Sequence, residues 1–187
     1  MDLLELDRTA IDRNTALLAA LEPEQLDLPS PCAGWTVRDV ARHLVDMSIQ
    51  FDVGAHGGKP RTGISDDLVA SYATASDLVT ESFRADGFLD RRAVLPGFGE
   101  HPGRNLIGAH FVDTVVHWWD IKRALGGDSA LDDDLALVAY KVARRYPDTP
   151  GMRGPGAAFG PALDVAEDAP VTDKLVALLG RSPDWRA

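Results

Sequence analysis

Apolar residues recur at helical spacing in four long stretches of the first 125 residues. The pattern predicts amphipathic helices over residues 3–21, from Thr36 onward, over 66–84 and over 104–125. The second of these helices opens with a capping-box pattern, because Asp39 follows Thr36 three residues later. Four helices within this length predict an all-α fold, and specifically a four-helix bundle.

The connections and the C-terminal third are less regular. Residues 54–63 are rich in glycine and predict a loop, whereas 93–103 predict a short hairpin or an irregular crossover. The expected organisation is a bundle over 1–127 and a small helical and irregular extension over 128–187, packed on the bundle as one structural unit. Within the extension we expect a helix over 132–146, a strand-like piece at 162–166 and a last helix over 171–179.

The helix predicted over 104–125 carries a polar line on an otherwise apolar surface. At about 100° per residue, His110, Asp113 and His117 fall on one side of it. A helix that is apolar on most sides is buried, and buried imidazoles and carboxylates must be paired or must coordinate something. His43, among the apolar residues of the second helix, is a candidate partner from a different element.

Two interpretations of His43, Asp113 and His117 follow from the residues. In the first, they hold a divalent metal ion between two helices. Imidazole and carboxylate suit Zn²⁺ best, with Fe²⁺ or Ni²⁺ as alternatives, and three protein ligands leave a position for water or substrate. In the second, they pair with one another or with backbone carbonyls in a wet core. The spacing D-x-x-x-H does not decide between these, because it occurs by chance in many helices.

Two further residues of the same helix are candidates for a supporting role. His110 is expected to support the ligands, to line the pocket, or simply to pack. Asp120 is expected either to orient His117 through a hydrogen bond or to form a surface ion pair with Lys122 or Arg123. The single cysteine, Cys32, is interpreted as a small buried apolar residue and not as a nucleophile.

Composition narrows the classes of partner. A formal net charge of −10 and a pI near 4.8 argue against nucleic acid. The acidic start lacks the basic and apolar segments of a secretion signal, and no apolar run approaches the roughly 18 residues of a membrane span. A lone cysteine forms no internal disulfide. We therefore expect a cytoplasmic protein that binds neither nucleic acid nor membranes.

Three stretches in the same order resemble a known family. P-C-x-x-W-T-V-R-D-V-x-x-H-L at 31–44 and V-V-H-W-W-D at 115–120 resemble the DinB-like superfamily. The closer likeness is to proteins related to the N-terminal domain of mycothiol-dependent maleylpyruvate isomerase. The end of the chain, at 168–183, resembles an uncharacterised and mostly actinobacterial branch of that group.

The resemblance implies a DinB-like bundle whose metal is held by one histidine of the second helix and an E-x-x-x-H pair of the fourth. By motif position these ligands are His43, Asp113 and His117. Asp113 stands where the family usually has glutamate, so this carboxylate is shorter by one methylene, roughly 1.5 Å of reach. Ligation by Asp113 then needs a helix shift or a bridging water; otherwise the site is weak or empty, or His110 substitutes as a ligand.

The activity that the resemblance implies is a transferase or isomerase reaction that depends on a low-molecular-weight thiol such as mycothiol or bacillithiol. A metal with an open position lowers the pKa of a bound thiol and holds the thiolate as a nucleophile. No general acid or thiol-binding arginine is identifiable from the sequence. The alternatives are a non-catalytic bundle that binds a metal or small ligand, and a metal-free bundle that acts through an oligomeric surface, such as that of a homodimer.

Overall fold

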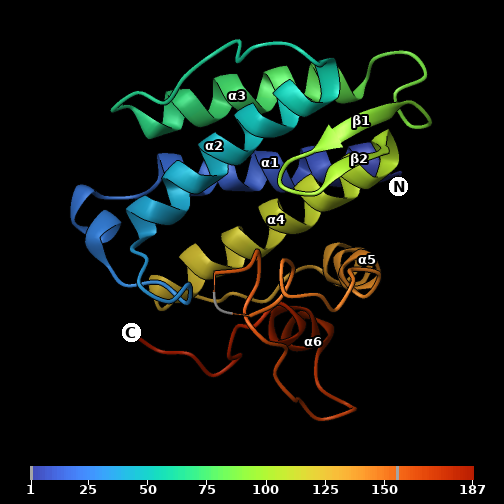
Figure 1. Cartoon of the computed structure of the whole chain (residues 1–187). Coiled ribbons are helices and arrows are strands. Elements are labelled where there is room, and N and C mark those ends of the chain that lie inside the picture. Colours follow the sequence, from blue (N-terminus) through green and yellow to red (C-terminus); the bar gives the residue numbers. More distant parts are fainter. Residues whose placement is uncertain (1, 155) are drawn as a thin grey trace.

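The computed structural model describes residues 2–154 and 156–187, and within them it confirms the predicted all-α class and the helical bundle (Figure 1). In chain order the elements are α1 (Leu3–Ala19), the short 3₁₀ helix η1 (Pro23–Asp27), α2 (Val37–His56), α3 (Leu68–Phe83), β1 (Arg92–Leu95), β2 (Gly99–Pro102), α4 (Gly103–Ala124), α5 (Asp133–Ala143) and α6 (Val171–Leu178). No helix in the described ranges combines the length and the apolar character needed to cross a membrane.

Helices α1 to α4 form the bundle, and each of them packs against two others. The neighbours of α1 are α3 and α4, and α2 also packs against α3 and α4. The apolar faces that the sequence pattern predicts therefore meet in the middle of the bundle. Buried residues from all four helices form the core there, among them Ile11, Leu18, Val40, Leu44, Val45, Tyr72, Ala75 and Ile121.

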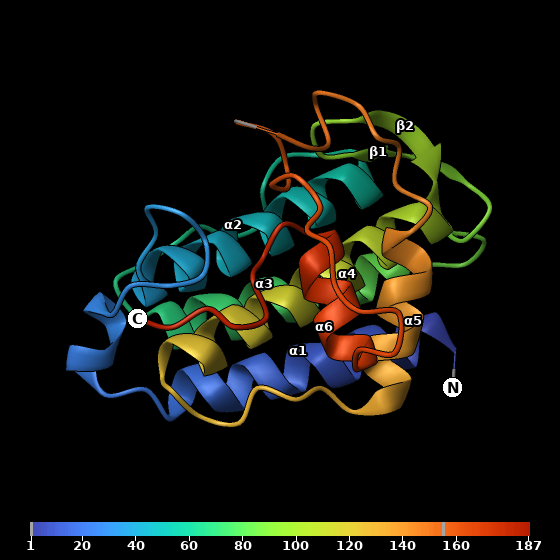
Figure 2. The same ribbon diagram turned by 90° about the horizontal axis from the view of Figure 1, so that it is seen from below.

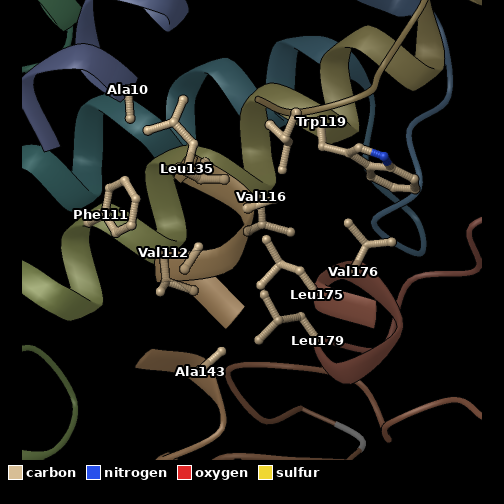
Figure 3. Packing of buried hydrophobic residues seen from close by; sticks show 14 of the residues in the cluster. Ala10, Phe111, Val112, Val116, Trp119, Leu135, Ala143, Leu175, Val176 and Leu179 are labelled. Atoms are coloured by element: carbon tan, nitrogen blue, oxygen red, sulfur yellow. The ribbon is translucent and has the colours of Figure 1, made fainter. Parts of the chain in front are cut away.

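Helices α5 and α6 cover the side of α4 that faces away from α2 and α3 (Figures 1 and 2). Figure 3 shows how apolar side chains of α4 meet those of the two later helices in a continuous cluster: Phe111, Val112, Val116, Trp119, Leu135, Ala143, Leu175, Val176 and Leu179. Helix α4 is thus buried between the bundle and the extension. That position explains why its sequence is apolar nearly all the way round.

The structure also confirms two local predictions. The backbone N–H of Thr36 donates to the Asp39 carboxylate at 2.8 Å and the Asp39 N–H donates to the Thr36 hydroxyl at 3.3 Å, so the capping box starts α2. The hairpin alternative for residues 93–103 is correct as well. Strands β1 and β2 pair antiparallel, with Ala93 opposite His101.

Two local predictions are wrong. Helix α2 continues through Gly54 to His56, so the loop predicted from residue 54 begins only at Gly57. Gly54 is required by packing and not by flexibility, because a Cβ atom there would lie 2.0 Å from the carbonyl oxygen of Val94 in β1. The strand-like piece at 162–166 is irregular and exposed. It has no partner strand within the described residues, and an isolated extended segment is not stable as a strand.

Candidate metal centre

His43 on α2 and Asp113 and His117 on α4 converge where the two helices pack against each other. The Asp113 Oδ1 atom lies 3.3 Å from His43 Nε2 and 3.4 Å from His117 Nε2. The two imidazole rings are nearly perpendicular, with centroids 4.6 Å apart. Three potential ligand atoms, two nitrogens and one oxygen, are therefore all within 4.8 Å of one another. The shorter carboxylate of aspartate reaches both imidazoles.

The spacing of these atoms is compatible with a metal site as well as with long direct hydrogen bonds. Bonds of about 2.0–2.1 Å to zinc give a tetrahedron whose edges are about 3.3–3.4 Å. Hydrogen bonds between a charged imidazole and a carboxylate are shorter, about 2.7–2.9 Å. The other two buried imidazole–carboxylate contacts have the shorter length: 2.9 Å between His117 Nδ1 and Asp120, and 2.8 Å between His110 Nδ1 and Asp7. The donor set and its spacing are thus compatible with a divalent ion.

The group is open on one side. The side chains of His43 and Asp113 retain 24% and 16% of their accessible surface, whereas His117 retains 5%. The exposed indole of Trp35, just before α2, lies beside both histidines, with centroid distances of 5.1 Å to His43 and 6.3 Å to His117. The partly exposed side of the group therefore lies beside an aromatic surface.

Asp120 orients His117, as one of its two predicted roles requires. The Nδ1–H group of His117 donates to Asp120 Oδ2 at 2.9 Å, and this bond leaves Nε2 directed at Asp113. The alternative, a surface ion pair of Asp120 with Lys122 or Arg123, is wrong. The Asp120 side chain is fully buried, because α4 is covered by the extension at this point.

Arg181, which the sequence pattern did not single out, and Cys32 complete the surroundings of Asp120. Arg181, just after α6, donates from Nη2 to Asp120 Oδ2 at 3.1 Å and from Nε to Oδ1 at 3.4 Å. The thiol of Cys32 donates to Asp120 Oδ2 at 3.2 Å and lies 3.1 Å from Arg181 Nη2. Cys32 packs partly buried against the apolar core, as interpreted, but its sulfur also belongs to a polar cluster with Asp120 and Arg181.

The protonation states of the metal-free protein follow from these contacts. Burial alone would raise the pKa of Asp113, but His43 and His117 lower it well below its ordinary value. Burial would lower the pKa of His117, but Asp113 and Asp120 raise it well above its ordinary value. Burial would also raise the pKa of Asp120, yet Arg181 and His117 lower it to about 2. Both carboxylates are thus ionised near neutral pH, and the site favours positive charge between them.

His110 lies elsewhere. It is buried between α1, α2 and α3: its Nδ1–H donates to Asp7, its Nε2 is 3.4 Å from the Ser48 hydroxyl, and the rings of Phe51 and Phe83 pack edge-on against it. The structure does not bring His110 into either group of potential metal ligands in the described ranges. The polar line on α4 therefore serves two separate polar clusters.

The sequence could have pointed to Cys32 and Trp35 as neighbours of the site, but not to Arg181. Cys32 and Trp35 stand in the motif that also contains His43, so the motif pointed to this corner of the molecule. Arg181 lies 61 residues after its partner Asp120, in a C-terminal tail that Figure 2 shows running back beside the loop before α2. No spacing rule connects these positions, so the contact depends on how the extension packs.

Comparisons with known proteins give a family match and two similar proteins. Residues 8–122 match the family model described as the mycothiol maleylpyruvate isomerase N-terminal domain. The chain is also similar to two uncharacterised proteins of Mycobacterium tuberculosis, one from each of two strains. Each is 35% identical over 182 residues, covering 97% of this chain and 99% of the relative. No solved structure matches the chain.

Proposed function

The chain belongs to the mycothiol maleylpyruvate isomerase N-terminal domain family, and on that premise we propose that it binds a divalent metal ion through His43, Asp113 and His117. Zn²⁺ suits two imidazoles and a carboxylate best, with Ni²⁺ and Fe²⁺ as the alternatives to test. The observation that carries the proposal is the convergence of Asp113 Oδ1 on two imidazole nitrogens at 3.3 and 3.4 Å. These distances support the proposal because they match the edges of a tetrahedral zinc site, about 3.3–3.4 Å.

We further propose that the metal serves a transferase or isomerase reaction that depends on a low-molecular-weight thiol. The family description names mycothiol, and a metal at an open position lowers the pKa of a bound thiol and stabilises the thiolate. The residues around the site have matching roles. Asp120 keeps the proton of His117 on Nδ1, so Nε2 is free to coordinate. Trp35 offers an apolar surface beside the open side.

Metal content is the first test. Protein purified without a histidine tag should bind about one equivalent of Zn²⁺ or Ni²⁺ per chain, as a site of this class does. His43→Ala should abolish this binding, because it removes one of only three ligands. His56→Ala is the matched control: His56 lies at the other end of the same helix, bonded to the Asp52 carbonyl. Metal content below about a tenth of an equivalent after loading would refute the proposal.

Thiol dependence is the second test. Mycothiol or bacillithiol should raise the melting temperature of the metal-loaded protein, since a ligand that binds only the folded state stabilises it. The same thiol should have no effect after chelation or on His43→Ala. Stoichiometric metal with no response to either thiol would reject the thiol-dependent enzyme and favour a non-catalytic metal-binding bundle.

A further inference from the structure

The imidazole of His117 has a different group of potential ligands at each nitrogen. On the Nε2 side are His43 and Asp113, and on the Nδ1 side are Cys32 and Asp120. In each group the three ligand atoms lie within 4.8 Å of one another. The geometry therefore offers two positions for a metal that share one imidazole, and a bare ligand count does not choose between them.

Ligand chemistry alone would favour the Nδ1 side. That group contains a thiol, and thiolate is the ligand that Zn²⁺ and softer ions prefer over carboxylate oxygen. Asp120 is also fully buried, so its charge requires a cation close by. A protein with only these residues would be expected to hold a zinc ion against Cys32.

Arg181 already occupies that place. Its Nη2 atom is 3.1 Å from both Cys32 Sγ and Asp120 Oδ2, and its Nε is 3.4 Å from Asp120 Oδ1. The remaining nitrogen, Nη1, donates to the carbonyl of Leu179 at 2.9 Å, and the side chain is 8% exposed. Every nitrogen of the guanidinium therefore makes a hydrogen bond. A metal ion that bound here would displace Arg181 from Asp120 and leave a buried positive charge unpaired, which is costly.

We propose that Arg181 is the resident cation of the Cys32–Asp120 group and thereby determines which side of His117 takes the metal. It keeps the ion with His43 and Asp113 and leaves the Cys32 thiol uncoordinated. The inference deepens the proposed function and rests on it for the Nε2 side. Arg181 lies outside residues 8–122, so a residue of the C-terminal extension selects between two ligand groups that both lie in the part that matches the family.

The wild-type protein allows a direct test, because Cys32 is its single cysteine. The rate at which a thiol reagent modifies Cys32 should be the same, within a factor of about two, with and without saturating Zn²⁺, since a sulfur that is not coordinated is not protected. Metal that slows the modification by about tenfold or more would place the thiol among the ligands and overturn the inference.

A second test removes the cation. Arg181→Met should bind Co²⁺ with the ultraviolet charge-transfer absorption of a thiolate–cobalt bond, which the wild-type protein should lack. The double variant Arg181→Met/Cys32→Ser should lose this band, and Arg181→Lys, which keeps the positive charge, should not show it. Arg153→Met is the matched control in the same extension, because Arg153 donates to the Leu178 carbonyl away from the cluster.

The outcomes separate the two proposals. A thiolate band in Arg181→Met alone supports the inference, whereas a band in the wild-type protein, or cobalt bound by Arg181→Met without one, overturns it. A wild-type protein that takes no metal at all refutes the proposed function. Arg181→Met then decides the inference by itself: thiolate-bound cobalt supports it and no cobalt overturns it. If Arg181→Met does not fold, Arg181→Gln, which keeps hydrogen-bonding groups without the charge, is read by the same criteria.

Discussion

Replacing Asp120 with asparagine should destabilise the metal-free protein by about 2–3 kcal/mol. The Asp120 side chain is fully buried and accepts hydrogen bonds from His117 and Arg181. Burial by itself would raise the pKa of this carboxyl, but these two partners lower it from 3.8 to about 2. That lowering corresponds to about 2–3 kcal/mol in favour of the ionised, folded form. Asparagine keeps the shape of the side chain and loses the charge.

Urea denaturation of the metal-free proteins at pH 7 measures this loss. A double-mutant cycle with Arg181→Met assigns it to the pair, because the two changes should share a coupling energy of about 1–3 kcal/mol. An Asp120→Asn variant destabilised by less than about 1 kcal/mol, with effects that simply add to those of Arg181→Met, would refute the reasoning.

The pH dependence has a definite sign. The folded pKa of Asp120 lies below its unfolded value, so the stabilisation is fully present above the unfolded pKa of 3.8 and is lost as the pH falls through about 2. The difference in unfolding free energy between wild type and Asp120→Asn should therefore be constant between about pH 6, where His117 is charged in both states, and about pH 5, and shrink below about 4. If the difference in unfolding free energy stays constant to the lowest pH at which both proteins fold, the pKa of folded Asp120 is not about 2 and the reasoning fails.

Two further changes test other parts of the fold. Asp7→Asn breaks the buried pair with His110 and should cost about 3–5 kcal/mol below pH 6.5. Burial alone would lower the pKa of His110, but the nearby Asp7 carboxylate outweighs burial and raises it. The cost of Asp7→Asn should therefore shrink as the pH rises through this raised pKa, which urea denaturation at several pH values would measure. Gly54→Ala should lower the unfolding free energy by about 1–3 kcal/mol despite the better helix propensity of alanine, because its Cβ would collide with a β1 carbonyl. Gly63→Ala, which meets nothing within 4 Å, should be neutral in the same thermal or urea unfolding assay.

The helices and the pairing of Asp113 with His117 could be predicted from the sequence because both depend on local geometry. An apolar period near 3.6 marks each bundle helix, and residues four apart on a helix are neighbours whatever surrounds them. His43 became the third candidate because it stands among the apolar residues of the second helix, and the resemblance of motifs implied the same residue. Its approach to within 3.3 Å of Asp113 depends on the packing of α2 against α4, which periodicity does not specify.

The errors have one common origin, which is contact between segments far apart in the chain. Gly54 was interpreted as a loop residue because the close approach of β1 is invisible in local sequence. The sequence allowed two interpretations of Asp120, and only the packing of the extension on that side of α4 shows that its side chain is buried. Cys32 appeared to be an isolated apolar residue because its partner Arg181 is 149 positions away.

The sequence by itself therefore determined the all-α class and the helices of the bundle, and it indicated His43, Asp113 and His117 as candidate ligands, since backbone propensity and apolar period act over one or two turns. Only the tertiary structure decided which buried polar groups contact one another and which cation neutralises each buried carboxylate. Burial is a property of the packed molecule, and the energy of a buried charge depends on every segment that reaches it.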